Sequence, residues 1–372
     1  MHKLRVFLVF GGKSTEHEVS LTSAKAIFEA LDTTKYDVSC IGITKTGAWI
    51  GGNKAQQHLL STAPARTPII EKGVSENLLD FLPPDVHTKS LTNDVCPPYI
   101  IIPVLHGRFG EDGIIQGLFE LEGAPYVGCG VLSSALGMDK VKQKEIAKQY
   151  GIPVTPWYAF SSRTWLTEKK RIIKEIIAAF HDTYPLFVKP GNTGSSIGVI
   201  KIHTKKELVA GIEKARTYDL KVIVEKGIVG GREIEVSCMG NDTVETSVCG
   251  EVVSANEFYD YDAKYANNKT KIIIPAPIPE KTSRIIRDMA KRAYKAGDCS
   301  GLARADFFLC KNGDILFNEI NTMPGFTNMS MYPKLWEASG ISFSVLLDRL
   351  IALGIERWRD RMAIVTEKGS TV

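Results

Sequence analysis

The fold of this chain is decided by the stretch Arg304-Ala305-Asp306, Asn312-Gly313 and Glu319-Ile320-Asn321-Thr322-Met323-Pro324-Gly325. An Asn-Gly pair between two apolar, alternating runs predicts a β-hairpin with a two-residue turn. Such a turn places Asp306 opposite Glu319 and Arg304 opposite Asn321. Because side chains alternate along a strand, all four then lie on one face of the hairpin.

The pairing of Asp306 with Glu319 predicts a bound cation. Directly opposed residues have Cβ atoms roughly 5 Å apart, and two carboxylates at that distance repel each other. The oxygen ligands Asp306, Glu319 and Asn321, with no Cys or His among them, favour Mg²⁺ and are compatible with Mn²⁺. Arg304 on the same face suits an anion held by the metal, and phosphate is the obvious one.

The composition is that of a soluble globular protein of two or three domains, with 372 residues, 44% hydrophobic and 24% charged. The net charge of +4 is small and no basic block stands out, so we expect neither nucleic acid nor membrane as a partner. The apolar run Leu4–Phe10 is too short for a signal peptide or a membrane span. Seven cysteines without a Cys-x-x-Cys pair favour reduced thiols in the cytoplasm.

The first third of the chain alternates strand and helix, which predicts an α/β domain with a parallel sheet over residues 1–139. Chemistry in such a domain lies at the C-terminal ends of the strands. We expect an insertion of short elements over 45–97, where the pattern is weak. The other expected elements are strands at Leu4–Phe10, Tyr36–Thr44 and Tyr99–Leu105, and helices at Ser14–Leu31, with Ser14 as N-cap, and at Gly113–Glu122.

Beyond Asp139 the pattern changes to a compact α+β unit. This predicts a small central domain over 140–225, a C-terminal domain over 226–362 and a polar tail over 363–372. The expected helices are 139–150, Leu166–Phe180, Lys205–Thr217, Glu280–Ala296 and Phe343–Trp358. The expected central strands are Trp157–Phe160, Leu186–Lys189, Val199–Ile202 and Val222–Glu225.

A glycine-rich segment, Gly191–Gly198, follows Lys189. Its backbone and the hydroxyls of Ser195 and Ser196 offer hydrogen-bond donors, and Lys189 adds a positive charge, as a loop over a triphosphate requires. The segment lacks the Gly-Lys-Ser/Thr ending of a Walker A loop. A plain hairpin loop is the alternative, and the metal hairpin downstream favours the phosphate interpretation.

Glu225-Lys226-Gly227-Ile228 ends a strand at the boundary between the second and third expected domains. A strand edge at that place can offer backbone groups to an adenine, and Glu233 can bond ribose hydroxyls. The alternative is a hinge that carries a surface charge.

Three further segments suit a ligand near the ends of strands. Glu16 starts a helix, where it either serves as a cap or binds the ammonium of a substrate. His106 opens a charged segment after a buried strand, where a ligand-binding loop and a merely solvated loop fit equally well. Residues 255–271 hold four aromatics and Lys264, which favours a lid over a site against aromatics packed on the body.

Together these residues resemble the D-alanine–D-alanine ligase family of the ATP-grasp superfamily, from about residue 4 to residue 355. The resemblance implies a three-domain ATP-grasp ligase of α/β and α+β class, with a parallel sheet in the N-terminal domain and ATP between the other two domains. The matching motifs are Gly11-Gly12 with Ser14 and Glu16-x-Glu18-Val19-Ser20, His106-Gly107 with Gly110-Glu111-Asp112-Gly113, Met138-Asp139-Lys140, Gly194-Ser195-Ser196, Tyr259-Asp260-Tyr261-x-x-Lys264-Tyr265 and Asn318-Glu319-x-Asn321-Thr322-x-Pro324-Gly325.

The resemblance also implies roles for single residues. Two Mg²⁺ would be held by Asp306, Glu319 and Asn321, with Glu319 bridging them. The catalytic residues would be Glu16, Ser195 and Tyr265, as a hydrogen-bonded trio at the first D-alanine, and Arg304. ATP would be bound by Lys140, Lys189, Ser196, Glu225, Lys226, Gly227, Ile228, Glu233, Phe258 and Lys264. The amino-acid substrates would contact Glu16, His106, Arg304, Gly325, Ser330 and Met331.

The implied activity is ATP-dependent ligation of two D-alanines through an acyl phosphate, for peptidoglycan precursors, by a cytoplasmic homodimer. One alternative is a D-alanine–D-lactate ligase, and Tyr265 speaks against it because vancomycin-resistance ligases of that type carry His there. Another ATP-grasp carboxylate–amine ligase is disfavoured by the set Glu16, Ser195 and Tyr265. A regulatory nucleotide-binding module without catalysis is disfavoured because Arg304 and the three metal ligands are all present.

Overall fold

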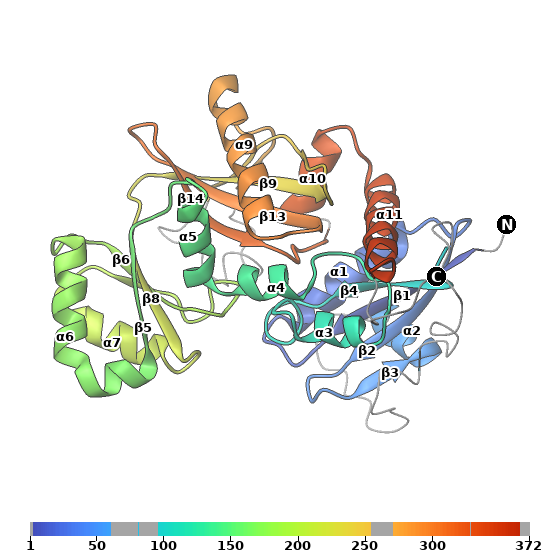
Figure 1. Cartoon of the computed structure of the whole chain (residues 1–372), viewed down its shortest axis with the longest axis horizontal. Helices are drawn as coiled ribbons and strands as arrows, with labels where there is room; N and C mark the ends of the chain where they lie inside the picture. The colour runs from blue at the N-terminus through green and yellow to red at the C-terminus, as the bar shows by residue number, and fades with distance from the viewer. Residues whose placement is uncertain (1–2, 61–80, 82–95, 254–270, 328, 365–372) are drawn as a thin grey trace.

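The computed structural model describes residues 3–60, 81, 96–253, 271–327 and 329–364, and these form three β-sheets (Figure 1). The sheets belong to the N-terminal, central and C-terminal parts of the chain, and hydrophobic side chains pack around each of them. Figure 1 shows the C-terminal sheet between the other two, with the N-terminal sheet at one end of the molecule and the central sheet at the other. Side chains from all three parts can therefore meet along the middle sheet.

The N-terminal sheet has the strand order β3-β2-β1-β4. β1 (Leu4–Gly11) pairs in parallel with β2 (Tyr36–Ile43) and with β4 (Tyr99–Val104), which confirms the expected parallel sheet. β3 (Trp49–Gly51) adds an antiparallel edge to β2. β3 and the following α2 (Gly52–Leu60) are the short elements expected over 45–97, and most of the remaining insertion lies outside the described residues.

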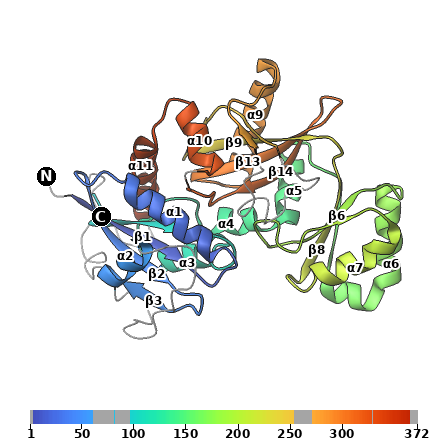
Figure 2. The ribbon, with the colours of Figure 1, turned by 180° about the vertical axis from the view of Figure 1, so that it is seen from behind.

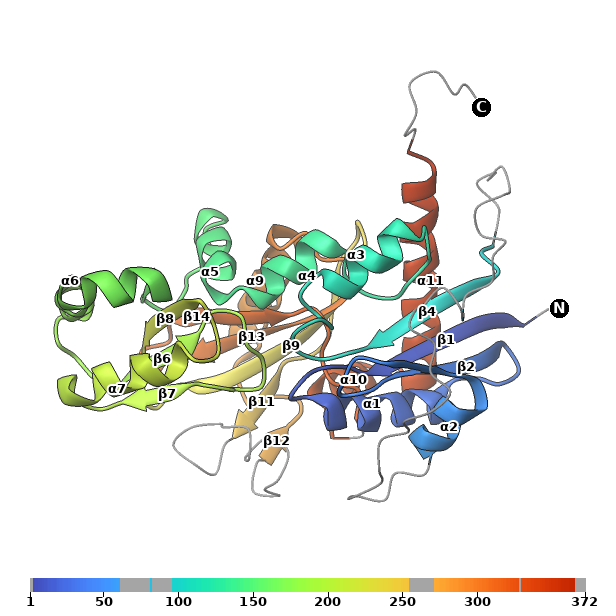
Figure 3. The same ribbon diagram turned by 90° about the horizontal axis from the view of Figure 1, so that it is seen from below.

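Helices cover both faces of this sheet, which explains why its strands are mostly apolar. α1 (His17–Ala30) packs with Leu8 on one face, and α3 (Ile114–Leu121) packs with Val9 on the other. Figure 3 shows α1 and α3 on opposite sides of the strands. The helices cover the faces of the sheet, so a polar site is expected in the loops at the C-terminal ends of the strands.

Ser14 is not the N-cap of α1, and this expectation was wrong. The helix begins at His17, and Glu16 occupies the N-cap position without a capping side-chain bond. Ser14 Oγ instead accepts a hydrogen bond from the backbone N–H of Glu16 at 3.0 Å. A Ser side chain that bonds the backbone two residues on forms a turn and competes with helix, so the turn displaces the helix start to His17.

The central sheet is antiparallel, in the order β5-β8-β6-β7. α6 and α7 cover it, and Trp165 of α6 and Val188 of β6 lie in its core. The bounds are β5 Trp157–Ser161, α6 Ser162–Phe180, β6 Leu186–Pro190, β7 Ile200–Ile202, α7 Lys205–Ala215 and β8 Lys221–Lys226.

The C-terminal sheet runs in the order β12-β11-β9-β13-β14, with β10 paired to β9. α5 (Lys140–Gln149) and α9 (Glu280–Ala296) pack on it, since Ala147 and Ile286 share its core with Phe317. The strands are β9 Arg232–Gly240, β10 Glu245–Thr246, β11 Gly250–Val253, β12 Lys271–Ile273, β13 Gly301–Leu309 and β14 Ile315–Asn321.

Three helices connect these sheets. α4 (Val131–Met138) and α10 (Met331–Ala338) were not expected from the sequence, and the expected last helix extends to Met362 as α11 (Phe343–Met362). α11 contacts α1 and β4 as well as β13, and Figure 2 shows it beside the N-terminal sheet. Among the described residues no single helix has the length and apolar character of a membrane span; α10 and α11, bent by 106° at the break between them, meet that criterion only as a pair.

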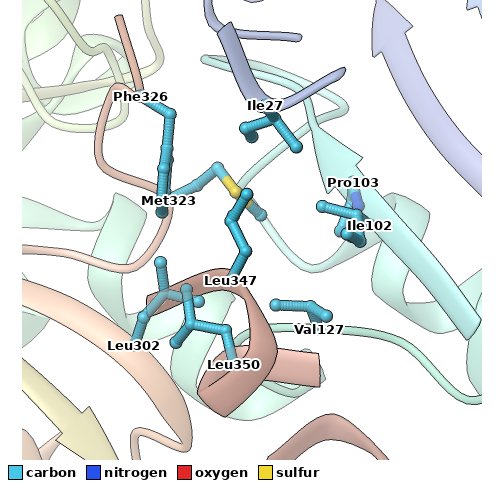
Figure 4. Close-up of a pocket in the computed structure, with 9 residues that line it drawn as sticks. All are labelled: Ile27, Ile102, Pro103, Val127, Leu302, Met323, Phe326, Leu347 and Leu350. Carbon is cyan, nitrogen blue, oxygen red and sulfur yellow. The ribbon is translucent and has the colours of Figure 1, made fainter. Parts of the chain in front are cut away.

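The N-terminal and C-terminal parts share one hydrophobic core. Figure 4 shows a small apolar cavity inside it, where α1 and β4 face the segment after β14 and α11. This contact fixes the segment after β14 next to the end of β4. The lining residues are Ile27, Ile102, Pro103, Val127, Leu302, Met323, Phe326, Leu347 and Leu350.

Candidate active site

The β13–β14 hairpin pairs Asp306 with Glu319 and Arg304 with Asn321, which confirms the predicted register at these positions. The predicted two-residue turn was wrong. Gly313 N–H donates to the Cys310 carbonyl at 3.0 Å, and the Cys310 N–H donates to the Asp314 carbonyl at 2.8 Å. These bonds close a longer turn over 310–314, in which Gly313 has a φ of 90°, a conformation that favours glycine.

A β-bulge reconciles the longer turn with the register at the site. Next to the turn, Leu309 pairs with Ile315, one residue out of step with the prediction. Phe307 pairs with Phe317, Asp306 pairs with Glu319, and Asn318 is therefore the extra residue of β14. A bulge of this kind places two residues of one strand opposite one residue of the other. The bulge therefore gives the pairing of Asp306 with Glu319 that was predicted from a two-residue turn, although the turn itself is longer.

Two cationic side chains of the protein, Arg304 and Lys140, lie beside the paired carboxylates. Arg304 Nε and Nη2 donate to the two oxygens of Asp306 at 2.8 and 2.7 Å, and Arg304 Nε is 2.9 Å from Glu235 Oε2. Lys140 Nζ is 3.6 Å from Glu319 Oε2. Burial alone would lower the pKa of Arg304, but Asp306 and Glu235 outweigh it and raise that pKa well above its ordinary value. Arg304 is therefore a permanent positive charge at the hairpin.

The hairpin also offers an oxygen donor set that fits a hard divalent cation. Asn321 Nδ2 donates to Asp306 Oδ2 at 3.0 Å, which turns the amide toward the carboxylate. No group of three or more His, Cys, Asp or Glu in the described ranges is arranged to hold a metal. The set is instead two carboxylates, Asp306 and Glu319, and one amide, a combination typical of Mg²⁺ bound together with substrate phosphates.

Glu225 joins the central sheet to α5. Its Oε2 lies 2.7 Å from Lys189 Nζ on β6, and its Oε1 lies 3.2 Å from Lys144 Nζ on α5. Burial alone would raise the pKa of Glu225, but Lys144 and Lys189 outweigh it and lower that pKa. The alternative of a hinge with a surface charge is excluded for Glu225, because its side chain is only 4% exposed.

The glycine-rich segment reaches α5 and the N-terminal part. Lys140 Nζ donates to the Thr193 carbonyl at 2.6 Å, and Ser195 Oγ donates to the carboxylate of Glu16. Ser195 and Ser196 have φ values of 47° and 60°. A Cβ at Gly194 would lie 2.8 Å from Glu16 Oε2, so a larger residue there would push the Glu16 carboxylate aside. Glu16 and Ser195, 179 positions apart, are brought together as predicted.

Two titratable groups lie beside Glu16, the partly buried Glu111 and the buried His106. Glu111 Oε1 accepts a hydrogen bond from Gly107 N–H at 2.8 Å, and burial, together with the charge of Glu16, raises the pKa of Glu111 well above its ordinary value. His106 Nδ1 lies 3.1 Å from the Met323 carbonyl, so Nδ1–H donates to it. Burial lowers the pKa of His106, and its Nε2 has no hydrogen-bond partner in the described part of the chain. His106 thus carries a lone pair on a buried nitrogen.

The remaining expected residues have clear positions. Lys226 ends β8, and the N–H of Gly227 just after it donates to the Pro185 carbonyl at 2.8 Å. Ile228 follows, and Glu233 lies on β9 opposite Phe308 of β13. On the other side of the hairpin, Ser330 Oγ accepts from Thr327 N–H at 2.9 Å, Gly325 lies against Ser330, and Met331 is buried at the start of α10. Phe258, Lys264 and Tyr265 lie outside the described residues.

Two residues of the site were missed from the sequence. Glu235 on β9 pairs with Asp306, and its spacing of two from Glu233 was a signal for a second carboxylate along that strand. Lys144 lies four residues after Lys140, a spacing that puts both side chains on one face of a helix. Neither signal tells which charged residue folding will bury.

Family models describe the chain in two pieces. The model of the D-ala D-ala ligase N-terminus matches residues 5–129, and the model of the D-ala D-ala ligase C-terminus matches residues 146–352. This chain belongs to the D-alanine–D-alanine ligase family. The D-alanine–D-alanine ligase of Natranaerobius thermophilus is 46% identical to it over 367 residues, which cover 97% of each chain.

Solved structures of the family have the same fold. The D-alanine–D-alanine ligase of Coxiella burnetii superimposes with a TM-score of 0.80 at 33% identity and covers 97% of both chains. The VanG D-Ala:D-Ser ligase of Enterococcus faecalis superimposes with a TM-score of 0.78 at 38% identity, covering 95% of this chain and 100% of that one. The family and the ATP-grasp fold class expected from the sequence are therefore confirmed.

Proposed function

We propose that this protein joins two D-alanines to D-alanyl-D-alanine with ATP, through an acyl phosphate, for peptidoglycan precursors. The observation that carries the proposal is the hydrogen bond from Ser195 to Glu16. It connects the glycine-rich segment suited to a triphosphate with the buried carboxylate suited to an amino-acid ammonium. Both substrates would thus meet at one contact between the central and N-terminal parts.

The nucleotide would lie between the central and C-terminal sheets. Lys140, Lys189 and Lys264 would contact phosphates, and Ser196 would donate from the glycine-rich segment. Lys140 Nζ, 2.6 Å from the Thr193 carbonyl, already lies at that segment. The adenine and ribose would be bound by Glu225, Lys226, Gly227, Ile228, Glu233 and Phe258. We further propose the domain limits 1–139, 140–225 and 226–362, with 363–372 as a tail, as divisions around this nucleotide site.

Two Mg²⁺, or Mn²⁺, would be held by Asp306, Glu319 and Asn321, with Glu319 shared between them. The metal would supply positive charge to the phosphates and so lower the cost of the charge that develops during transfer. Arg304, fixed beside Asp306, would stabilise the transferring phosphoryl group and then the oxyanion of the tetrahedral intermediate. Its raised pKa keeps it charged at every pH at which the enzyme works.

The reaction takes two steps. A carboxylate oxygen of the first D-alanine attacks the γ-phosphorus of ATP, which forms an acyl phosphate and releases ADP. The neutral amine of the second D-alanine then attacks the acyl carbon, phosphate leaves with the bonding electrons, and the amine gives up a proton. Glu16, Ser195 and Tyr265 would orient the first substrate, and the segment 255–271 would keep water from the acyl phosphate.

The second substrate would lie near the segment after β14. His106, Gly325, Ser330 and Met331 would surround it, and the first three contribute groups that can donate or accept hydrogen bonds. The bond from His106 to the Met323 carbonyl holds this segment against the end of β4. The second amino acid would thereby be kept on the Glu16 side of the hairpin.

One assay tests this function. ADP release is measured with D-alanine, with L-alanine, and with D-alanine plus an excess of D-lactate or D-serine, each with Mg²⁺ or with EDTA. We expect turnover with D-alanine and Mg²⁺ and none with L-alanine or EDTA, and the product identified by mass to be the dipeptide. Turnover that ignores the stereochemistry of alanine would exclude the proposal.

A second candidate function differs only in the second substrate. The likeness to a structure named as a D-Ala:D-Ser ligase, at 38% identity, favours testing D-serine beside D-lactate. Comparing the masses of the mixed products with that of D-alanyl-D-alanine decides between them. A product dominated by the serine dipeptide or by the lactate ester would replace the first candidate.

We also propose a cytoplasmic homodimer. All seven cysteines are free thiols, as a reducing compartment maintains. Ile114 and Leu121, 57% and 84% exposed and seven residues apart on α3, offer an apolar strip to a second copy. Light scattering of the purified protein tests the dimer, and a monomer at micromolar concentration would exclude it.

A further inference from the structure

Lys144 is the most deeply buried lysine in the described part of the chain, at 1% exposure. It lies on α5, four residues beyond Lys140, so both side chains leave the same face of the helix. Lys140 faces Glu319 and the glycine-rich segment, and Figure 1 shows α5 beside β14. Burial of an ammonium is costly unless its donors are all used.

The Lys144 ammonium has three polar neighbours. Nζ donates hydrogen bonds to Thr155 Oγ1 at 2.8 Å and to the Asn318 carbonyl at 3.2 Å, and it forms an ion pair with Glu225 Oε1 at 3.2 Å. The three partners come from the segment after α5, from β8 of the central sheet and from β14 of the C-terminal sheet. One side chain therefore ties three separate pieces of the fold together.

The Asn318 carbonyl belongs to the bulge that sets the register of the hairpin. If the pairing next to the turn continued without the bulge, Asp306 would face Asn318, and Glu319 would face Ala305. Side chains alternate along a strand, so Glu319 would then point to the face away from Asp306. β14 is the edge strand of its sheet, and Lys144 Nζ donates to the Asn318 carbonyl at 3.2 Å. A partly buried carbonyl needs such a donor.

The carboxylate of Glu225 contacts two lysines, one with each oxygen. Lys144 Nζ forms an ion pair with Glu225 Oε1 at 3.2 Å, and Lys189 Nζ donates a hydrogen bond to Glu225 Oε2 at 2.7 Å. The orientation of Lys189, a proposed phosphate ligand, thus depends on a carboxylate whose other oxygen is fixed by Lys144. The ammonium contacts both a group that would orient a phosphate-binding lysine and the backbone that orients a metal ligand.

We propose that Lys144 is a positioning residue that fixes the positions of Glu319 and Glu225 relative to each other. Binding of the metal and binding of the nucleotide are then coupled. This inference rests on the proposed function, since it assigns Lys144 to the metal and nucleotide site of that reaction. Lys144 would touch neither substrate. Loss of Lys144 would reduce the factor by which a metal tightens nucleotide binding.

The test measures ADP binding by calorimetry, with EDTA and with saturating Mn²⁺, and takes the ratio of the two dissociation constants as the metal-dependent gain. Lys144→Met keeps most of the side-chain volume and removes the charge. Leaving a buried acceptor unpaired costs about 1–3 kcal/mol, so the gain should fall about 5- to 100-fold. The KM for D-alanine should stay within about twofold of the parent's, because that substrate lies on the Glu16 side.

Lys142→Met is the matched control. Lys142 lies on the same helix, its side chain is 50% exposed, and it pairs only with Glu145 of that helix among the described ion pairs. This variant should keep the metal-dependent gain of the parent. A Lys144→Met variant with an unchanged metal-dependent gain would overturn the positioning role. So would a variant whose KM for D-alanine rises by the same factor by which the gain falls, because that result indicates a merely structural role.

A second variant covers the case in which Lys144→Met does not fold. Thr155→Val keeps the shape of the side chain and removes the nearest partner of the ammonium, so the gain should fall about two- to fivefold. An unchanged gain in that variant overturns the inference. A parent without any metal-dependent gain would instead contradict the metal assignment of the proposed function, and the inference would fall with it. ADP release by the parent separates these two failures.

Discussion

Asp306 faces Glu319 across the β13–β14 hairpin, and the bulge at Asn318 is what places the two carboxylates on one face. If the pairing next to the turn continued through Asn318 without a bulge, Glu319 would lie opposite Ala305. The two carboxylates are neutralised by Arg304 on one side and by Lys140 on the other. The protein's own cations thus offset the repulsion between the two carboxylates.

Inserting one alanine between Asn318 and Glu319 should abolish ADP release. Phe317 pairs with Phe307 and the bulge takes one residue, so the inserted alanine would face Asp306 and Glu319 would move opposite Ala305, on the other face. One preorganised charged group is then lost, an effect on the order of 100-fold or more. Asn318→Ala keeps the backbone carbonyl and should leave activity near the parent's. The coupled ADP assay measures both variants. An insertion variant that folds and remains active would contradict the importance of this register.

Glu319→Gln should nearly abolish ATP turnover while the fold stays intact. The change keeps size and shape but removes the negative charge of the proposed bridging ligand. Thermal unfolding checks the fold, and ADP release checks the activity. Asp314→Asn is the control, because Asp314 is an exposed acid in the turn of the same hairpin. Equal activity losses in both variants would remove the special role of Glu319.

His106 should make stability depend on pH. Burial lowers the pKa of His106 from its ordinary value of 6.5, so the unfolded chain binds a proton at a pH where the folded chain does not. Stability is therefore fully present above about pH 6.5 and decreases as the pH falls, by up to about 1.4 kcal/mol per pH unit from this group.

The variant His106→Asn isolates that contribution. Urea unfolding of parent and variant is compared at several pH values, and the parent should lose more stability than the variant on acidification. His203→Asn, at an exposed histidine, should follow the parent. If the free energy of unfolding depends on pH equally in the parent and in His106→Asn, the conclusion that His106 is buried and neutral is wrong.

The hairpin was predictable from its residues, and the contact of Glu16 with Ser195 was predictable from the resemblance to the family. Asn-Gly indicates a turn, and paired acids on one strand face indicate a cation. The turn length was not predictable in the same way, since Asn318 in the bulge resembles any other strand residue. The register at the site was correct because a longer turn and a bulge offset each other.

The residues that were missed depend on tertiary packing. Lys144 resembles its exposed neighbour Lys142 in sequence, and only the fold shows which lysine is buried against Glu225. α10 was missed because Pro333 lies inside it, although a proline is tolerated in the first turn of a helix. α4 was missed because Ser and Gly residues weaken its helical propensity.

Tyr265 should control both the strength of dipeptide synthesis and the choice of the second substrate. We expect Tyr265 to close over the first D-alanine and to bond within the network of Ser195 and Glu16. Tyr265→Phe keeps the ring and loses one neutral hydrogen bond, worth about 0.5–1.5 kcal/mol, so activity should fall about 2- to 15-fold. Tyr265→His should lower dipeptide synthesis more.

The histidine variant adds a pH signature that the phenylalanine variant lacks. Near pH 6, roughly the ordinary pKa of histidine, an imidazolium at this position would attract the carboxylate of D-lactate and raise the ratio of ester to dipeptide. Both products are measured by mass from mildly acidic to mildly basic pH, with D-alanine and D-lactate present together. Tyr265→Phe serves as the control, because its ring does not titrate and its product ratio should not rise in acid. If the ratio for Tyr265→His is equally flat, residue 265 does not face the second substrate.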